Sequence, residues 1–187
     1  MKGIVFTEFL GFVAQRYGED AVDDIIEASA LPSGGAYTSV GTYNHAELVT
    51  LCDALAQQTG VAVPVLVQAF GFHLSGSFAR GYPAFFARCS HLFDFLESIE
   101  AHIHKEVQKL YPDAELPTFT VLERTASRLV LDYRSPRQMG DLAVGLIKGS
   151  AQHFGIQVRV DPQAHDTADG PMVRFVIDVA GDTSIPV

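Results

Sequence analysis

The spacing of apolar residues changes at Pro117, and this change limits what the chain can fold into. Before Pro117, apolar side chains recur every three to four positions, which places them on one face of an α-helix. After it they alternate with polar residues, as in 129–133, which is typical of half-buried β-strands. The sequence therefore predicts an α+β fold, with a helical N-terminal lobe followed by a lobe that holds a four-stranded antiparallel sheet and further helices.

Capping and helix-breaking residues set the expected helix boundaries. The expected helices cover residues 3–17, 20–29, 44–60, 64–80, 90–111 and 138–154. We expect Asp20 and Asn44 to cap their helices, because a short polar side chain can accept a hydrogen bond from the free N–H groups of the first turn. Gly60 and Gly155 are expected at the ends of theirs, and Pro112 is expected to end the long helix.

The second lobe is expected to contain strands over residues 119–121, 129–133, 156–160 and 173–179. A tight turn is expected near Thr125, and a polar loop from Pro162 to Gly170. At 187 residues the chain is long enough for one good core. We therefore expect one domain, with a helical lobe over about 1–60, a second lobe over about 61–180, and a frayed tail over 181–187.

Composition and charge exclude several classes of function. The net charge is −9 and the basic residues are scattered, whereas nucleic-acid binding needs clustered Lys and Arg. No apolar run approaches the ~18 residues of a membrane span, and the N-terminus lacks the features of a signal peptide. Cys52 and Cys89 lie in apolar helical contexts, so we expect reduced core thiols in a cytoplasmic protein.

His102 and His104 are the two closest of the seven histidines. Side chains two positions apart on a helix point about 200° apart, so this pair cannot share one metal ion. The buried stripe of the long helix is expected at Leu92, Leu96, Ile99, Ile103, Val107 and Leu110. His104 lies off the centre of that stripe, and periodicity alone therefore favours a packing role for it.

Tyr133, Ser135 and Arg137 occupy alternate positions of an extended segment, so their side chains are expected on one side. A phenol, a hydroxyl and a guanidinium that converge can bind an anion, with Arg taking a carboxylate through two hydrogen bonds. The alternative is a strand edge whose polar face is only solvated.

No signature of an ordinary enzyme is present: the chain has no Gly-x-Ser-x-Gly, no Cys-x-x-Cys and no phosphate-binding glycine loop. The residues taken alone leave open a carrier or hydrolase of a small carboxylate or lipid, with Arg137 as the anion clamp.

Four segments together resemble one known family. They are Met1-Lys-Gly-Ile4, Ala36-Tyr-Thr-Ser-Val-Gly-Thr-Tyr43, His104-x-x-Val107-x-x-x-Tyr111-Pro112 and Tyr133-x-Ser135-x-Arg137. They are similar to the H-NOX (haem nitric oxide/oxygen binding) family, whose sensor domain is also found in soluble guanylate cyclase. The resemblance covers nearly the whole chain and weakens after about Val160.

The resemblance implies a role for each matching residue. It implies that His104 is the proximal ligand of a b-type haem, bound through neutral imidazole. Tyr133, Ser135 and Arg137 would hold the haem propionates, and Pro117 would press on the porphyrin and distort it. The haem would lie between the two lobes, so that movement of the His104 helix changes the angle between them.

The resemblance also assigns Val5, Phe9, Leu74 and Leu142 to the distal side of the haem. Oxygen-binding members carry a distal tyrosine that donates a hydrogen bond to bound O₂, and none of these four side chains can donate one. NO bonds strongly to ferrous haem without a donor. The resemblance therefore implies a sensor of NO, which also binds CO and binds O₂ poorly.

Some bacterial relatives carry a cysteine-rich zinc site in the second half of the chain. No cysteine follows Cys89 here, so no zinc is expected. Since the resemblance covers nearly the whole chain, we expect no fused signalling domain, and the resemblance implies a sensor without enzymatic activity. Its regulated partner would be a separate histidine kinase or cyclic-di-GMP enzyme.

Overall fold

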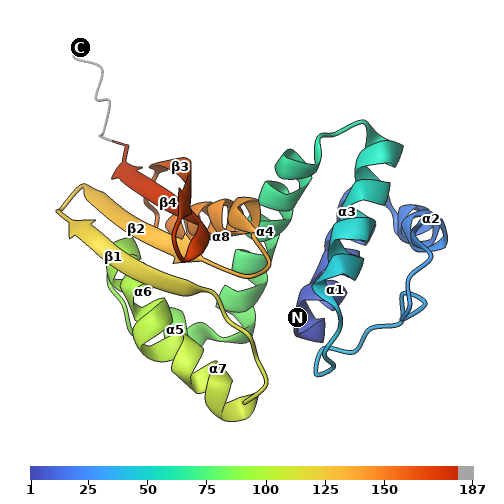
Figure 1. Cartoon of the computed structure of the whole chain (residues 1–187), viewed down its shortest axis with the longest axis horizontal. Helices are drawn as coiled ribbons and strands as arrows, with labels where there is room; N and C mark the ends of the chain where they lie inside the picture. The colour runs from blue at the N-terminus through green and yellow to red at the C-terminus, as the bar shows by residue number, and fades with distance from the viewer. Residues whose placement is uncertain (181–187) are drawn as a thin grey trace.

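The computed structural model describes residues 1–180, which form two groups of elements on either side of one long helix (Figure 1). The first group is α1 (Gly3–Tyr17), α2 (Glu19–Ser29) and α3 (His45–Thr59), and α4 (Val63–Gly81) lies between the groups. The helices of the second group are α5 (Pro83–Phe86), α6 (Leu92–Ser98), the π-helix η1 (Ile99–Ile103), α7 (His104–Leu110) and α8 (Gly140–His153). Its strands are β1 (Thr118–Arg124), β2 (Arg128–Arg134), β3 (Val158–Thr167) and β4 (Gly170–Val179). The expected α+β fold is confirmed, and the tail expected over 181–187 lies outside the described residues.

The four strands form one antiparallel sheet in the order β1-β2-β4-β3. The polar loop expected from Pro162 to Gly170 is wrong, because β3 runs to Thr167 and pairs with β4 along its whole length. β3 is an edge strand, where a proline and polar residues are tolerated since one side of the strand needs no partner. Its composition therefore resembles that of a loop.

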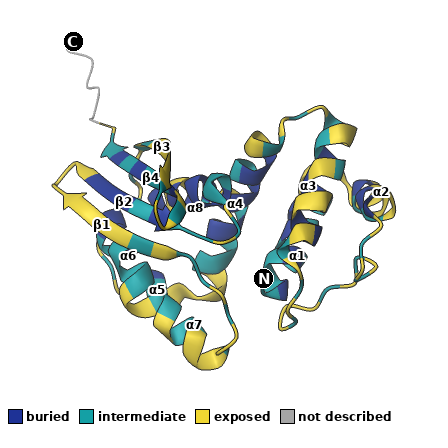
Figure 2. Ribbon diagram, viewed as in Figure 1, coloured by how far each residue is buried: buried dark blue, intermediate teal, exposed yellow. Residues whose placement is uncertain are grey.

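Two hydrophobic clusters divide the interior (Figure 2). The first cluster is built by α1 to α4 and reaches Leu142 on α8. The second cluster lies between the sheet and the helices α6 and α8. Each cluster is rich in phenylalanine, and helix α4 contributes to both through Phe70 at its middle and Phe78 near its end.

Helices α4 and α8 approach each other closely because glycines face each other across their interface. A Cβ atom on Gly145 would lie 2.2 Å from the carbonyl oxygen of Gln68, and one on Gly71 would lie 2.4 Å from that of Leu142. A side chain of any size at these positions would force the two backbones apart. These two helices therefore form a rigid core that joins the two clusters.

The helix ends follow the expectations in part. Asn44 caps α3 by accepting a hydrogen bond from the Ala46 N–H group, and Gly60 ends that helix in the left-handed conformation, as expected. The expected cap at Asp20 is wrong, because α2 already begins at Glu19 without a side-chain cap. Helix α8 is shorter than expected at its start, since Gln138 has a φ of 50° and lies in the preceding turn.

The long helix expected over 90–111 is interrupted in the structure. It begins at Leu92, changes to π-helix over Ile99–Ile103 and returns to α-helix at His104. The extra residue of a π-turn shifts the helix face, so the expected buried stripe does not continue. Leu92 and Leu96 are buried, but Leu110 is 74% exposed. Cys89 lies in the connection before α6 and is only half-buried, so the expectation that it is a helical core thiol is also wrong.

Within residues 1–180, no single helix is long and apolar enough to cross a membrane. Helices α3 and α4 meet the length and composition of a membrane span only when they are taken together, and the chain bends by 114° between them.

Candidate functional site

His104 is the first residue of α7, directly after the π-turn, and its N–H group donates to the Ile99 carbonyl. The Nδ1 atom of its ring lies 3.1 Å from a carboxylate oxygen of Glu100, and the same oxygen accepts a hydrogen bond from the Phe119 N–H group at 3.3 Å. Glu100 therefore holds the His104 ring and is itself held by the start of strand β1.

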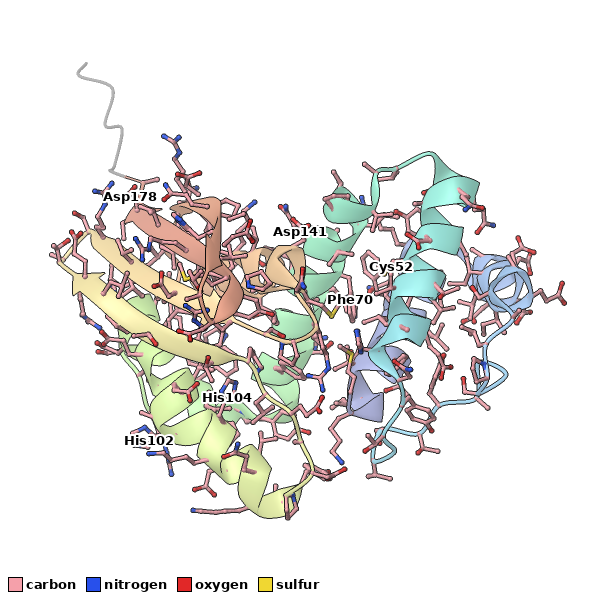
Figure 3. All side chains as sticks on the ribbon, viewed as in Figure 1. Cys52, Phe70, His102, His104, Asp141 and Asp178 are labelled. Atoms are coloured by element: carbon pink, nitrogen blue, oxygen red, sulfur yellow. The ribbon has the colours of Figure 1, made fainter. Side chains whose placement is uncertain are left out.

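The environment of His104 favours its neutral form. Burial lowers the pKa of His104 below its ordinary value, although the Glu100 carboxylate raises it in part. When Nδ1 carries the proton and donates to Glu100, Nε2 keeps a free lone pair. Among residues 1–180, Glu100 is the only hydrogen-bond partner of this ring. His102 is exposed on the outer side of the same segment (Figure 3).

The rings of His104, Phe119, Tyr133 and Phe175 form a continuous series of contacts. The His104 and Phe119 centroids are 5.9 Å apart, those of Phe119 and Tyr133 are 5.4 Å apart, and those of Tyr133 and Phe175 are 5.7 Å apart. Phe119 and Tyr133 are opposite each other in the β1–β2 register. The fold thus brings His104 and Tyr133, far apart in the sequence, to the same end of the sheet.

Tyr133, Ser135 and Arg137 are near one another but do not form one extended strand. Strand β2 ends at Arg134, and the Ser135 hydroxyl accepts a hydrogen bond from the Arg137 N–H group at 3.2 Å in the turn that follows. Burial raises the pKa of Tyr133, and its hydrogen bond with Ser135 opposes that rise. The expected alternate positions on one strand are therefore wrong for Ser135 and Arg137, which a turn brings together instead.

The guanidinium of Arg137 is largely buried and is paired with Glu115. It donates to the Glu115 carbonyl oxygen at 2.6 Å and to a carboxylate oxygen of the same residue at 2.9 Å. The Glu115 side chain is 73% exposed, whereas the Arg137 side chain is 11% exposed. Glu115 lies two positions before Pro117, which is half-buried on the connection from α7 to β1.

The N-terminus contacts this same connection. The Lys2 ammonium lies 3.2 Å from an Asp113 carboxylate oxygen and 4.4 Å from the centroid of the Tyr111 ring. Burial and the nearby Arg137 charge lower the pKa of the Met1 amino group, which donates to the Tyr43 carbonyl at 2.7 Å. The first group of helices is thereby tied to the end of α7.

Phe9, Leu74 and Leu142 belong to the first hydrophobic cluster, and Val5 packs against it. Their side chains have no hydrogen-bond donors. Phe70 shares this region, since its ring lies 5.1 Å from that of Phe9 in a perpendicular arrangement and it faces α3 near Cys52 (Figure 3). Sequence reasoning did not select Phe70 as a site residue, although it lies one turn before Leu74 on α4.

The donor set limits what the site can hold. Among residues 1–180, no group of three or more His, Cys, Asp or Glu side chains is placed to bind a metal ion. A single neutral imidazole with a free lone pair suits a metal that an organic group already carries. The phenol, hydroxyl and guanidinium at Tyr133, Ser135 and Arg137 suit carboxylates on such a group. These residues therefore fit a metal-bearing macrocycle with acidic side chains.

A crevice of about 290 Å³ lies beside Tyr133 and Ser135 and reaches the β3–β4 hairpin at His165 and Met172. His104 does not line it.

Comparison with known proteins agrees with this class of site. The model of the Haem-NO-binding family matches residues 2–161. The chain is 39% identical to a solved H-NOX protein from K. algicida in the unliganded Fe(II) state, with a TM-score of 0.90 over 100% of both chains. It is 25% identical to an H-NOX protein from S. oneidensis in the Fe(II)NO state, with a TM-score of 0.87 over 97% of this chain and 100% of the other. A search of curated proteins found no match.

The chain belongs to the H-NOX family of haem-based gas sensors. The resemblance derived from its four sequence segments is therefore confirmed at the level of the family.

Proposed function

We propose that this protein binds haem b through Nε2 of His104 and senses nitric oxide. The observation that carries the proposal is the pairing of His104 Nδ1 with Glu100, which fixes the orientation of the ring and leaves Nε2 available, while burial favours the neutral imidazole. A histidine that ligates a metal is commonly held in this way by a carboxylate on its other nitrogen.

Tyr133, Ser135 and Arg137 would hold the propionates in this proposal, and Pro117 would contact the porphyrin. The Arg137 guanidinium has five N–H donors and uses two of them on Glu115. A propionate can therefore bind to the remaining donors or replace the exposed Glu115 carboxylate. The half-buried Pro117 lies on the same connection, between the His104 helix and β1.

The apolar side chains of Val5, Phe9, Leu74 and Leu142, together with Phe70, support selectivity for NO over O₂. Ferrous haem binds NO strongly without assistance, whereas bound O₂ carries partial negative charge and depends on a hydrogen-bond donor. These five residues offer no donor in the region proposed as distal. We expect poor O₂ binding for this reason.

Signalling would act through movement of the segment that carries His104. Neither η1 nor α7 contains a fully buried residue, and only Ile99 and Ile103 pack partly against the second cluster, so displacement of this segment costs less packing energy than displacement of α4 or α8. Lys2, Asp113 and Tyr111 tie its end to the first group of helices. A shift at His104 would therefore reach α1, and through it a partner protein. The proposed partner is a histidine kinase or a cyclic-di-GMP enzyme in the cytoplasm, and the protein itself would have no enzymatic activity and bind no zinc.

The absorption spectrum of the reduced protein tests the proposal. We expect a Soret band that shifts with NO and with CO, and no stable oxy spectrum in air. A protein that stays colourless after addition of haemin would contradict haem binding, and a stable oxy complex would contradict the proposed selectivity. Leu142→Tyr is a matched variant, because it adds one donor to the proposed distal side.

The alternative function, a carrier or hydrolase of a small carboxylate with Arg137 as its clamp, is less well supported. Arg137 is already paired with Glu115, and membership of a haem-binding family accounts for the same donors.

A further inference from the structure

A crevice of about 460 Å³ opens on the surface where α1, α4 and α8 meet, away from His104. Phe12 and Arg16 line it from α1, Phe72 and Arg80 from α4, and Gln152 from α8. Its volume lies within the range of ordinary binding sites. The crevice therefore combines apolar and cationic groups from both sides of the molecule.

The charge of this crevice differs from that of the rest of the protein, which carries a net charge of −9. Four arginines are paired with carboxylates, in the pairs Arg124–Asp94, Arg128–Asp178, Arg137–Glu115 and Arg174–Asp132, whereas Arg88, Arg134 and Arg159 form no such pair among residues 1–180 but do not line this crevice. Among residues 1–180, neither Arg16 nor Arg80 has a carboxylate within salt-bridge distance.

The groups around the two arginines leave their charge largely uncompensated. Arg16 lies 5.9 Å from the centroid of the Tyr17 ring, and Arg80 donates to the Ser77 hydroxyl at 3.1 Å. The Glu8 carboxylate lies 3.7 Å from Nε2 of His73, which also lines the crevice. Both guanidiniums thus keep donors for an external acid.

An apolar surface continues from the crevice along α4. Phe72 is 41% exposed and Val65 is 57% exposed, and they lie two turns apart on the same face of the helix. An exposed aromatic side chain beside unpaired arginines is typical of an interface centre, where aromatic residues and arginines provide most of the binding energy. A small free anion would use the arginines but not this apolar surface.

We propose that the crevice binds an acidic segment of a partner protein, with carboxylates on Arg16 and Arg80 and an apolar side chain on Phe72. Charge complementarity decides the occupant, since two guanidiniums without a carboxylate partner line the same crevice beside an exposed aromatic ring. In the proposed sensor, this crevice would be the surface that contacts the partner protein. That this contact depends on the haem state rests on the proposed function.

The two arginines lie on different helices, and these helices are not held to the rest of the molecule in the same way. Arg80 is on α4, which is joined to α8 by glycine-to-backbone contacts. Arg16 is on α1, which contacts α4 through aromatic rings such as the Phe12–Phe70 pair, 5.9 Å apart. Side-chain contacts of this kind permit sliding. An acidic segment that bridges Arg16 and Arg80 would therefore favour one arrangement of the helices over the other.

Fluorescence anisotropy with a synthetic peptide tests the proposal on the haem-loaded protein. The probe is a labelled helical peptide with two glutamates one turn apart and a leucine on the same face, and the control peptide has glutamines in place of the glutamates. We expect the acidic peptide to bind and the Arg16→Gln, Arg80→Gln double variant to weaken it by about tenfold or more, because charge-assisted hydrogen bonds are lost. Phe72→Ala should weaken binding by a smaller factor.

Arg88→Gln is the matched control, because Arg88 is exposed but does not line the crevice. Equal binding of the two peptides, an unchanged affinity in the double variant, an equal loss in Arg88→Gln, or no binding of the acidic peptide would each overturn the proposal.

Absorption spectra of the same samples separate this inference from the proposed function. A normal spectral response to NO without arginine-dependent peptide binding would overturn only the proposal that the crevice binds an acidic segment. Arginine-dependent peptide binding to a protein that takes up no haem would support the proposed binding site and contradict the proposed function. Peptide affinities that differ between the NO-free and NO-treated protein would support both.

Discussion

The α4–α8 core and the segment that carries His104 are held in place by opposite means. In the core, Gly71 and Gly145 let two helix backbones touch, and the surrounding side chains are buried. In η1 and α7 no residue is fully buried. Ile99 and Ile103 pack partly against the second cluster, and polar contacts of Glu100 and, beyond the end of α7, of Asp113 also hold the segment.

This difference shows where a movement can begin. Displacing α4 against α8 would break close packing, which has no low-energy intermediate positions. Displacing η1 and α7 exchanges hydrogen bonds and ion pairs that water can replace at small cost. A signal that starts at His104 would therefore travel through the weakly packed segment while the core stays fixed.

Removing the ring of His104 should have the largest effect. We expect His104→Gly to lose most of its haem and to recover it with free imidazole, because no other residue supplies the proposed ligand. His102→Gly carries the same helix penalty on an exposed position two residues away and should keep its haem. Equal haem contents in the two variants, measured from the Soret absorbance, would show that another residue binds the iron.

Adding one methyl group to the core should have the next largest effect. In Gly145→Ala the new Cβ would lie 2.2 Å from the Gln68 carbonyl oxygen. We expect a loss of about 3 kcal/mol in the free energy of unfolding, at the upper end for overpacking, measured by urea denaturation. Gly11→Ala is the control, since nothing lies within 4 Å of a Cβ there. It should increase the free energy of unfolding, by at most about 1 kcal/mol. Similar results for both would mean that the core is not rigid.

The two thiols should report the same contrast in packing. Burial raises the pKa of Cys52 to about 12, so at pH 8 only about one part in ten thousand is thiolate. Cys89 is half-buried near the loosely packed segment. We expect a thiol reagent to modify Cys89 at least about tenfold faster than Cys52 in the native protein. Cys89→Ser should remove the fast phase, and in urea both thiols should react alike.

Breaking the tie between Lys2 and Asp113 should change stability least. Asp113 is exposed, so Asp113→Asn should leave the urea midpoint nearly unchanged. Amide hydrogen exchange over 104–110 should nevertheless become faster, because the end of α7 loses its contact with the first group of helices. Glu106→Gln, which removes an ion pair within α7 itself, is the control. Faster exchange only in that control would show that the Lys2 contact does not restrain α7.

The sequence predicted the elements whose signals are local. Asn44 and Gly60 bound α3 as expected, because capping depends on only a few neighbouring residues. The turn near Thr125 also forms, where the Thr125 hydroxyl accepts from the Arg128 N–H group at 2.9 Å. The start of edge strand β3 was expected, but its second part from Pro162 to Thr167 was taken for a loop, because its pairing with β4 is not visible in its own polar composition.

The candidate site was predictable as a set of residues but not as a geometry. The His104, Tyr133, Ser135 and Arg137 pattern identified the family, and the family is confirmed. The role of each residue stays a prediction. Glu100 precedes His104 by four residues, about one helical turn, yet this spacing gives no reason to assign the carboxylate a function.

By itself, the sequence determined the α+β class, the change from helix to strand at Pro117, and the family, because periodicity and short motifs are properties of the chain. Only the tertiary structure decided that Glu100 lies in a π-turn directly before His104, that Arg137 is paired with Glu115, and that Arg16 and Arg80 line one crevice. The physical reason is distance along the chain. Pairing, burial and backbone contact depend on elements that folding brings together, and no local pattern records them.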